Sequence, residues 1–211
     1  MTFNLALIAL LDGVSYASLL FLVAVGLTLI FGVLGVLNVA HGSLYAIGAY
    51  MAATIGSWMT AQGFSPWLTF PGMLIAALIT GVVVGGLMER FLLRHIYDKD
   101  PILQLLITFA VFMILENVQR MVWGVQPYFM AEPLRALGNV RVLGIQYTAY
   151  QTLFLPGMAL LTMFGLRYFL RNTLAGAKIT AVTEDREAAT SIGIDAKQVY
   201  FITFVIGACL A

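Results

Sequence analysis

The chain has 211 residues, of which 61% are hydrophobic and only 10% are charged, and its formal net charge is +1. Soluble proteins carry about 25% charged residues, so this composition excludes an ordinary soluble domain. It predicts an all-α protein that crosses a lipid bilayer several times. A net charge this close to zero gives no support for nucleic-acid binding. No Asp, Glu, Lys or Arg occurs between Asp12 and Glu89, a stretch that must contain several crossings.

Apolar segments predict five complete membrane helices, each close to the length of about 20 residues that a crossing needs. They cover residues 14–37, 44–59, 68–88, 102–123 and 150–170. A sixth begins near Val199 and reaches Ala211, which gives about 20 Å of helix against a hydrocarbon core of about 30 Å. We expect one membrane domain over residues 1–211 that is truncated at its C-terminus, inside this sixth helix.

Basic residues predict the orientation of the helices, because cytoplasmic loops are rich in Lys and Arg. One basic region holds Arg90, Arg94 and Lys99, and a second, two crossings later, holds Arg167, Arg171, Lys178, Arg186 and Lys197. The intervening residues 124–149 contain Pro127, Glu132, Pro133 and several glycines, a pattern typical of an external loop with turns. We therefore expect both basic regions in the cytoplasm and the N-terminus outside.

The densest cluster of charge lies at residues 183–195. Five charges oppose burial there by about 15 kcal/mol at about 3 kcal/mol each, so the segment must contact water or protein. Thr183 is a suitable N-cap and Gly193 suits the C-terminal turn, which predicts a short helix over 183–193. Its expected apolar side consists of Ala188, Ala189 and Ile192, and its polar side of Arg186, Glu187, Thr190 and Ser191. The alternative is a helix that merely rests on the membrane surface.

Residue order makes this segment more specific. Glu187-Ala188-Ala189, followed after three residues by Gly193, resembles the coupling loop of ABC importer permeases. Residues 26–32 (GLTLIFG) and 38–45 (NVAHGSLY) are similar to the N-terminal signature of branched-chain amino acid permeases of the LivH type. Val39 stands where that family usually has phenylalanine.

The resemblance implies a permease subunit in the bacterial inner (cytoplasmic) membrane that imports leucine, isoleucine and valine. Its implied partners are separate ATPase subunits that bind the ATP, a second permease subunit of the LivM type, and an extracytoplasmic substrate-binding protein. Contact with the ATPase would involve Glu184, Arg186, Glu187, Ala188, Ala189, Ile192 and Gly193. Permeases of the same type for urea, short amides or other amino acids remain an alternative. A more distant one is an ion-coupled carrier or channel that uses Glu116 or His41.

Polar residues inside the apolar segments are candidates for a substrate pathway. Asn38, His41 and Gly42 lie between the first two predicted helices, where they either cap and break the helices or contact substrate. On the fourth predicted helix Gln104, Thr108, Glu116 and Gln119 share one side, with Arg120 one turn beyond Glu116. Interhelical hydrogen bonding is the simpler interpretation of that stripe, and a role for Glu116 in the pathway is the other.

Several sequence patterns of enzymes are absent. No Gly-x-x-x-x-Gly-Lys loop is present to hold ATP, and no His-Glu-x-x-His or Gly-x-Ser-x-Gly motif occurs. His41 has no second histidine or carboxylate near it in sequence, and Cys209 is the only cysteine, so neither a metal site nor a disulfide is expected. We expect a transport subunit without a cofactor or an enzymatic activity of its own.

Overall fold

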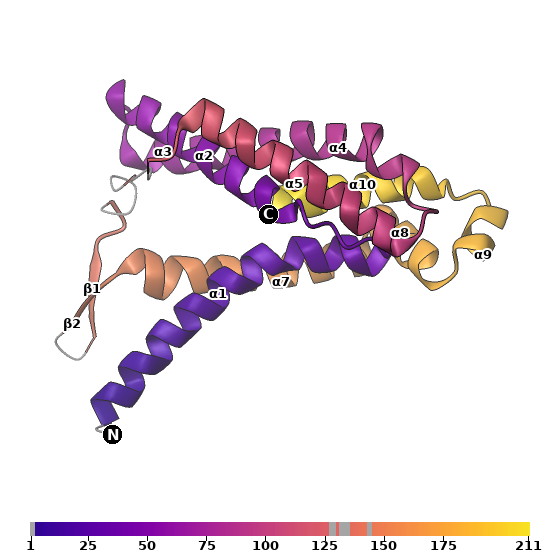
Figure 1. The fold of residues 1–211 in the computed structure, drawn as a ribbon. Coiled ribbons are helices and arrows are strands. Elements are labelled where there is room, and N and C mark those ends of the chain that lie inside the picture. Colours follow the sequence, from indigo (N-terminus) through magenta and orange to yellow (C-terminus); the bar gives the residue numbers. More distant parts are fainter. Residues whose placement is uncertain (1–2, 127–129, 131–135, 143–144) are drawn as a thin grey trace.

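The computed structural model describes residues 3–126, 130, 136–142 and 145–211, and these are mostly helical (Figure 1). The first half contains α1 (Phe3–Leu34), α2 (His41–Ala61), α3 (Pro66–Thr80), the π-helix η1 (Gly81–Gly85), α4 (Gly86–Phe91), the 3₁₀-helix η2 (Leu93–His95) and α5 (Pro101–Trp123). The second half contains strands β1 (Asn139–Val142) and β2 (Ile145–Thr148), the π-helix η3 (Tyr150–Phe154), α7 (Leu155–Asn172), α8 (Leu174–Glu184), α9 (Arg186–Ser191) and α10 (Ala196–Leu210).

Four helical stretches of the described chain are long and apolar enough to cross a membrane, which confirms a polytopic membrane protein. They are Leu5–Leu34, Pro66–His95, Pro101–Trp123 and Tyr150–Asn172. The second predicted crossing forms α2, which is helical but is not one of these four stretches. The count of five crossings and the external N-terminus therefore stay predictions.

The first helix differs from its predicted bounds at both ends. It begins at Phe3 and continues through Asp12, whose side chain is exposed and so does not interrupt the helix. It ends at Leu34 rather than at residue 37, because Gly35 adopts a positive φ of 68° that ends a helix readily. The residues up to Ala40 are therefore not helical, although most of them are apolar.

Residues 124–149 contain a feature that the sequence did not predict. Strands β1 and β2 form an antiparallel hairpin in which Asn139 pairs with Thr148 and Val142 with Ile145. Pro127, Glu132 and Pro133, on which the prediction of a turn-rich loop relied, lie outside the described residues. The hairpin joins α5 to η3 and leaves the helical part of the molecule at one end (Figure 1).

Helix α10 lies between two groups of helices. Figure 1 shows α1 beside α7 on one side, and α2 to α5 on the other. A Cβ atom added to Gly26 of α1 would collide with the carbonyl oxygen of Gly207 in α10, so the two backbones touch. On the opposite side, a Cβ on Gly85 of η1 would lie only 2.6 Å from the Cβ of Ala208. Phe204 is fully buried between these contacts, which makes α10 the centre of the core.

Candidate functional site

The short helix α9 projects from the end of the molecule where α8 and α10 meet (Figure 1). Its N-cap is Asp185, whose carboxylate accepts a hydrogen bond of 2.9 Å from the Ala188 amide. The predicted cap, Thr183, is wrong: Thr183 lies in the last turn of α8, and its hydroxyl donates to the Ile179 carbonyl. Aspartate and threonine are both good caps, but only Asp185 has the extended backbone that separates two helices.

Gly193 ends α9 as its sequence position predicts. It has a φ of 90°, a conformation that glycine adopts without strain. The Gly193 amide donates to the Thr190 carbonyl at 3.0 Å, and the Ile194 amide donates to the Ala189 carbonyl at 3.1 Å. These two bonds form a Schellman motif, which satisfies carbonyls that the end of a helix would leave free.

The predicted apolar side of α9 divides into a buried and an exposed part. Ala189 is buried against the core, whereas Ala188 is exposed and Ile192 is 78% exposed. The division arises because α9 is short and rests on the protein along a narrow line through Ala189. Glu187, Thr190 and Ser191 are exposed as well. The outward surface of α9 thus combines a carboxylate, a small residue and a large apolar side chain.

Arg186 anchors α9 to the first basic region. Its guanidinium donates a hydrogen bond of 3.1 Å to the Asp98 carboxylate, between Arg94 and Lys99 in sequence. It also lies over the ring of Tyr200 in α10, with Cζ 5.5 Å from the ring centroid. The hydrogen bond to Asp98 raises the pKa of Arg186 above its usual value, and Tyr200 adds to the effect. The two regions predicted to be cytoplasmic therefore lie at the same end of the molecule.

The connection between α1 and α2 returns toward the middle of α1. The Nε2 atom of His41, the first residue of α2, lies 3.3 Å from the carbonyl oxygen of Val23. Val23 stands about three turns before α1 ends, a rise of about 16 Å. Helix α2 therefore begins beside the middle of the first crossing, and Leu37, on the way there, accepts a hydrogen bond from Thr108 of α5.

Two buried polar atoms at this connection have no hydrogen-bond partner among the described residues. Asn38 is 2% exposed; its Oδ1 accepts from the Ala40 amide at 3.1 Å, but its Nδ2 is unpartnered. His41 is 3% exposed, and its Nδ1 is unpartnered. Gly42, in contrast, is exposed. The interpretation that these residues satisfy backbone groups at the break explains the hydrogen bond of Asn38 Oδ1. It does not explain the unpartnered Asn38 Nδ2 and His41 Nδ1, since an unsatisfied buried polar group costs about 1–3 kcal/mol.

The polar stripe on α5 forms interhelical and loop contacts, as its simpler interpretation predicts. Gln104 Nε2 donates to the carbonyls of Ile96, Tyr97 and Lys99, and Gln119 Nε2 donates to the carbonyl of Ser43 in α2. Both side chains and Thr108 are buried. Glu116 does not belong to this buried set: it is partly exposed, pairs with Arg120 at 2.5 Å and lines an open hollow.

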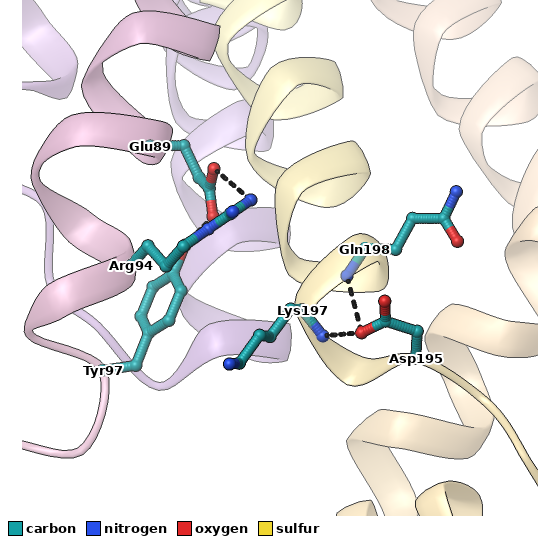
Figure 2. Close-up of polar contacts among 6 residues, drawn as sticks. All are labelled: Glu89, Arg94, Tyr97, Asp195, Lys197 and Gln198. Atoms are coloured by element: carbon teal, nitrogen blue, oxygen red, sulfur yellow. Dashed lines mark hydrogen bonds and ion pairs between the residues drawn. The ribbon is translucent and has the colours of Figure 1, made fainter.

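Sequence reasoning missed one buried carboxylate, that of Glu89 in α4. Its side chain is fully buried and accepts hydrogen bonds from Tyr97 Oη at 3.2 Å and from Arg94 Nη2 at 3.4 Å (Figure 2). In the sequence Glu89 is simply the first charge after a long apolar stretch, which usually marks the membrane surface. The following Arg94 and Tyr97 were the available signal, but their approach to Glu89 depends on the turn at η2.

Within the described ranges, no three His, Cys, Asp or Glu side chains gather as a metal site would require. The prediction that the chain needs no metal or cofactor stays a prediction.

Comparison with known proteins places the whole arrangement in context. The profile of a family described as branched-chain amino acid transport system permease component matches residues 9–211. The chain belongs to this family. The match includes α9 and the α1–α2 connection, the two segments whose residue order resembles this family.

Several curated relatives are similar over almost the whole chain. The high-affinity branched-chain amino acid transport system permease protein LivH of Salmonella typhimurium is 27% identical over 204 residues, covering 95% of this chain. LivH of Escherichia coli K12 is 26% identical over 204 residues, and BraD of Pseudomonas aeruginosa is 26% identical over 209 residues. The chain spans 66% of the length of the two LivH relatives. No solved structure matches it significantly.

Proposed function

We propose that the protein is a permease subunit of an ABC importer that moves branched-chain amino acids across the cytoplasmic membrane. The observation that carries the proposal is the exposed helix α9, which has a defined cap at Asp185 and a defined end at Gly193, in a chain of this family. The relatives LivH and BraD are permease proteins of branched-chain amino acid transport systems. ATP would be bound by separate subunits, so the chain itself would not be an enzyme.

In this proposal α9 is the coupling helix that docks on an ATPase subunit. Glu187, Ala188 and Ile192 are exposed and free to contact a partner, whereas Ala189 and Arg186 attach the helix to its own subunit. Glu184 and Gly193 lie at the two ends of this surface. When the ATPase subunits close, they would displace α9 as a rigid body, and α8 and α10, which contact it, would carry the displacement into the membrane.

The start of α2 is the proposed place where substrate passes. Irregular backbone at this depth occurs where it is buried in protein or lines a cavity, and broken helices form the substrate sites of many transporters. With Nε2 of His41 donating to Val23, the neutral ring leaves Nδ1 as an acceptor, while Asn38 Nδ2 is a donor. An amino acid carries groups that match both, a carboxylate and an ammonium. Because Gly42 has no side chain, the substrate could approach the backbone closely at this position.

Completion of the pathway would need further components. A second permease subunit of the LivM type would form the other wall, and an extracytoplasmic binding protein would deliver the substrate and select it. A permease of the same type for urea, short amides or other amino acids is the second candidate, because Asn38 and His41 offer groups that would also bind an amide. An ion-coupled carrier has less support, since Glu116 is partly exposed and already paired with Arg120.

Crosslinking tests the coupling assignment. In a Cys209→Ala background, a cysteine at Ala188 should crosslink to a co-expressed ATPase subunit, because position 188 is exposed on α9. The matched control is a cysteine at Ala189, which is 3% exposed and should not react. If position 188, together with 187 and 192, fails to crosslink in an assembled complex, the coupling assignment is wrong.

A further inference from the structure

The buried carboxylate of Glu89 lies just beyond an irregular part of its helix. The crossing from Pro66 to His95 is α-helical up to Thr80, continues as the π-helix η1 and becomes α-helical again in α4. π-Helical turns are rare and concentrate at functional sites. Glu89 follows η1 by one turn, and its side chain is 0% exposed. A carboxylate in such a place needs its polar partners, because an unpaired buried charge is strongly destabilising.

A chain of contacts leads from Glu89 to α9. Tyr97 donates to Glu89 Oε1 at 3.2 Å, and its ring meets the ring of Tyr200 edge-on, with centroids 5.1 Å apart and an interplanar angle of 68°. Tyr200 lies in the first turns of α10. The guanidinium of Arg186, the first residue of α9, lies over the Tyr200 ring. Figure 2 shows the first part of this chain, with Glu89, Arg94 and Tyr97 grouped together beside the ribbon of α10.

This chain of contacts joins α9 to the helix formed by η1 and α4, two elements that would have to move together during transport. Helix α10 carries Tyr200 at one end and packs against η1 at the other, where a Cβ on Gly81 would lie 2.8 Å from the Cα of Cys209. Close-packed contacts of this kind transmit displacement rather than absorb it. The start of α10 is itself fixed, because Asp195 caps the amides of Lys197 and Gln198 at 2.9 and 3.3 Å (Figure 2).

We propose that Glu89 is a positioning residue for energy coupling, which through Tyr97, Tyr200 and Arg186 holds α9 at a fixed place relative to α4 and the π-helix η1. The inference rests on the proposed function, because it requires α9 to receive the movement of an ATPase. It differs from simple packing in one respect. Loss of the polar contact between Tyr97 and Glu89 separates ATP hydrolysis from uptake, while the subunits still assemble.

The variant Tyr97→Phe tests this directly, because it removes the hydroxyl and keeps the ring against Tyr200. In the full complex reconstituted in vesicles, we expect the leucine taken up per ATP hydrolysed to fall about tenfold, the effect of losing a hydrogen bond to a charged group. Assembly with the ATPase subunits and the rate of ATP hydrolysis should be unchanged. Tyr168→Phe is the matched control, since Tyr168 is 66% exposed on α7, and its ratio should equal that of the unmodified protein.

A second variant separates positioning from packing. Glu89→Gln keeps an oxygen that can accept from Tyr97 and should retain most of the uptake per ATP, whereas Glu89→Leu should lose it. Arg186→Gln combined with Tyr97→Phe should cost no more than the larger of the two single changes, because both act on one chain of contacts. Additive losses, or an unchanged ratio in Tyr97→Phe, would overturn the proposal. So would a loss of uptake that only follows a loss of assembled complex.

The failure of this inference can be told from failure of the proposed function. A cysteine at Ala188, placed in the Tyr97→Phe protein, reports whether α9 still meets the ATPase. A crosslink with a normal uptake ratio rejects the role of Glu89 and leaves the coupling helix intact. No crosslink from Ala188→Cys in the Cys209→Ala protein that keeps Tyr97 rejects both.

Discussion

Polar side chains around α9 have hydrogen-bond partners, whereas some of those at the start of α2 do not. Around α9, Asp185 caps the helix, Arg186 pairs with Asp98, and the buried Glu89 nearby accepts two hydrogen bonds. At the start of α2, buried atoms of Asn38 and His41 have no partner in the described part of the chain. Hydrogen-bonded polar groups hold a fixed geometry. Buried polar groups without a partner destabilise the fold until a polar ligand forms hydrogen bonds with them. This difference supports the two proposals, transmission of force at the first region and binding at the second.

Charge reversal on α9 should have the largest effect of the changes proposed, and it acts on the first region alone. Glu187→Arg places a cation on the exposed first turn of α9, where the helix dipole opposes it and where the proposed ATPase surface would meet a carboxylate. We expect ATP-dependent uptake to fall at least about a hundredfold, the effect of an electrostatic mismatch of several kcal/mol at an interface. The permease should still insert into the membrane. Uptake of radiolabelled leucine at the normal rate would contradict the assignment of α9.

A methyl group at the contact between α1 and α10 should have an intermediate effect. In Gly26→Ala the new Cβ would collide with the Gly207 carbonyl and approach His41 Cε1 to 3.1 Å. We expect a loss of about 1–3 kcal/mol in the free energy of unfolding, typical of overpacking, and measurable as a lower Tm in detergent.

Gly32→Ala on the same helix is the control, because nothing lies within 4 Å of its added Cβ. It should be neutral or stabilising by up to about 1 kcal/mol. Equal Tm values for the two variants would show that α1 and α10 are loosely packed against each other, contrary to the contacts described.

The smallest effect is expected from pH. Burial raises the pKa of the Tyr97 hydroxyl above its usual value, and the carboxylate of Glu89 adds to this. Because the folded pKa exceeds the unfolded one, the contribution of the neutral hydroxyl is fully present below the unfolded pKa of about 10 and is lost only above it. The difference in uptake per ATP between the unmodified protein and Tyr97→Phe should therefore be constant from about pH 6 to about pH 9. A difference that varies within this window would contradict the assigned donor.

The sequence predicted those features that depend on local chemistry. Long apolar stretches placed the membrane helices, Gly193 marked the end of α9, and the stripe from Gln104 to Gln119 was correctly interpreted as hydrogen bonding to neighbouring segments. Thr183 failed as a cap because cap preference does not reveal that α8 continues to Glu184. The predicted end of α1 at residue 37 was wrong because most residues after Gly35 are still apolar. Hydropathy does not detect the change of backbone direction at Gly35.

Other features depend on contacts between distant residues and had no local signal. The burial of Glu89 requires the turn at η2 to bring Tyr97 back toward α4. The unpartnered atoms of Asn38 and His41 depend on the position of α1, α5 and α10 around them. The roles of these residues in transport stay predictions, to be decided by the variants described above.

The π-helix η1 also has a consequence for the length of the chain. A π-turn contains one more residue than an α-turn, and each residue of an α-helix advances the side chains by about 100° around its axis. Deletion of one residue between Gly81 and Gly85 would restore regular α-helix and leave the direction of Glu89 nearly unchanged, because the wide π-turn already absorbs the extra residue. One residue inserted between Gly86 and Glu89 would instead turn Glu89 by about this angle, away from Tyr97. Homologous permeases that keep a carboxylate at this position should therefore vary in length within η1 more readily than between Gly86 and Glu89.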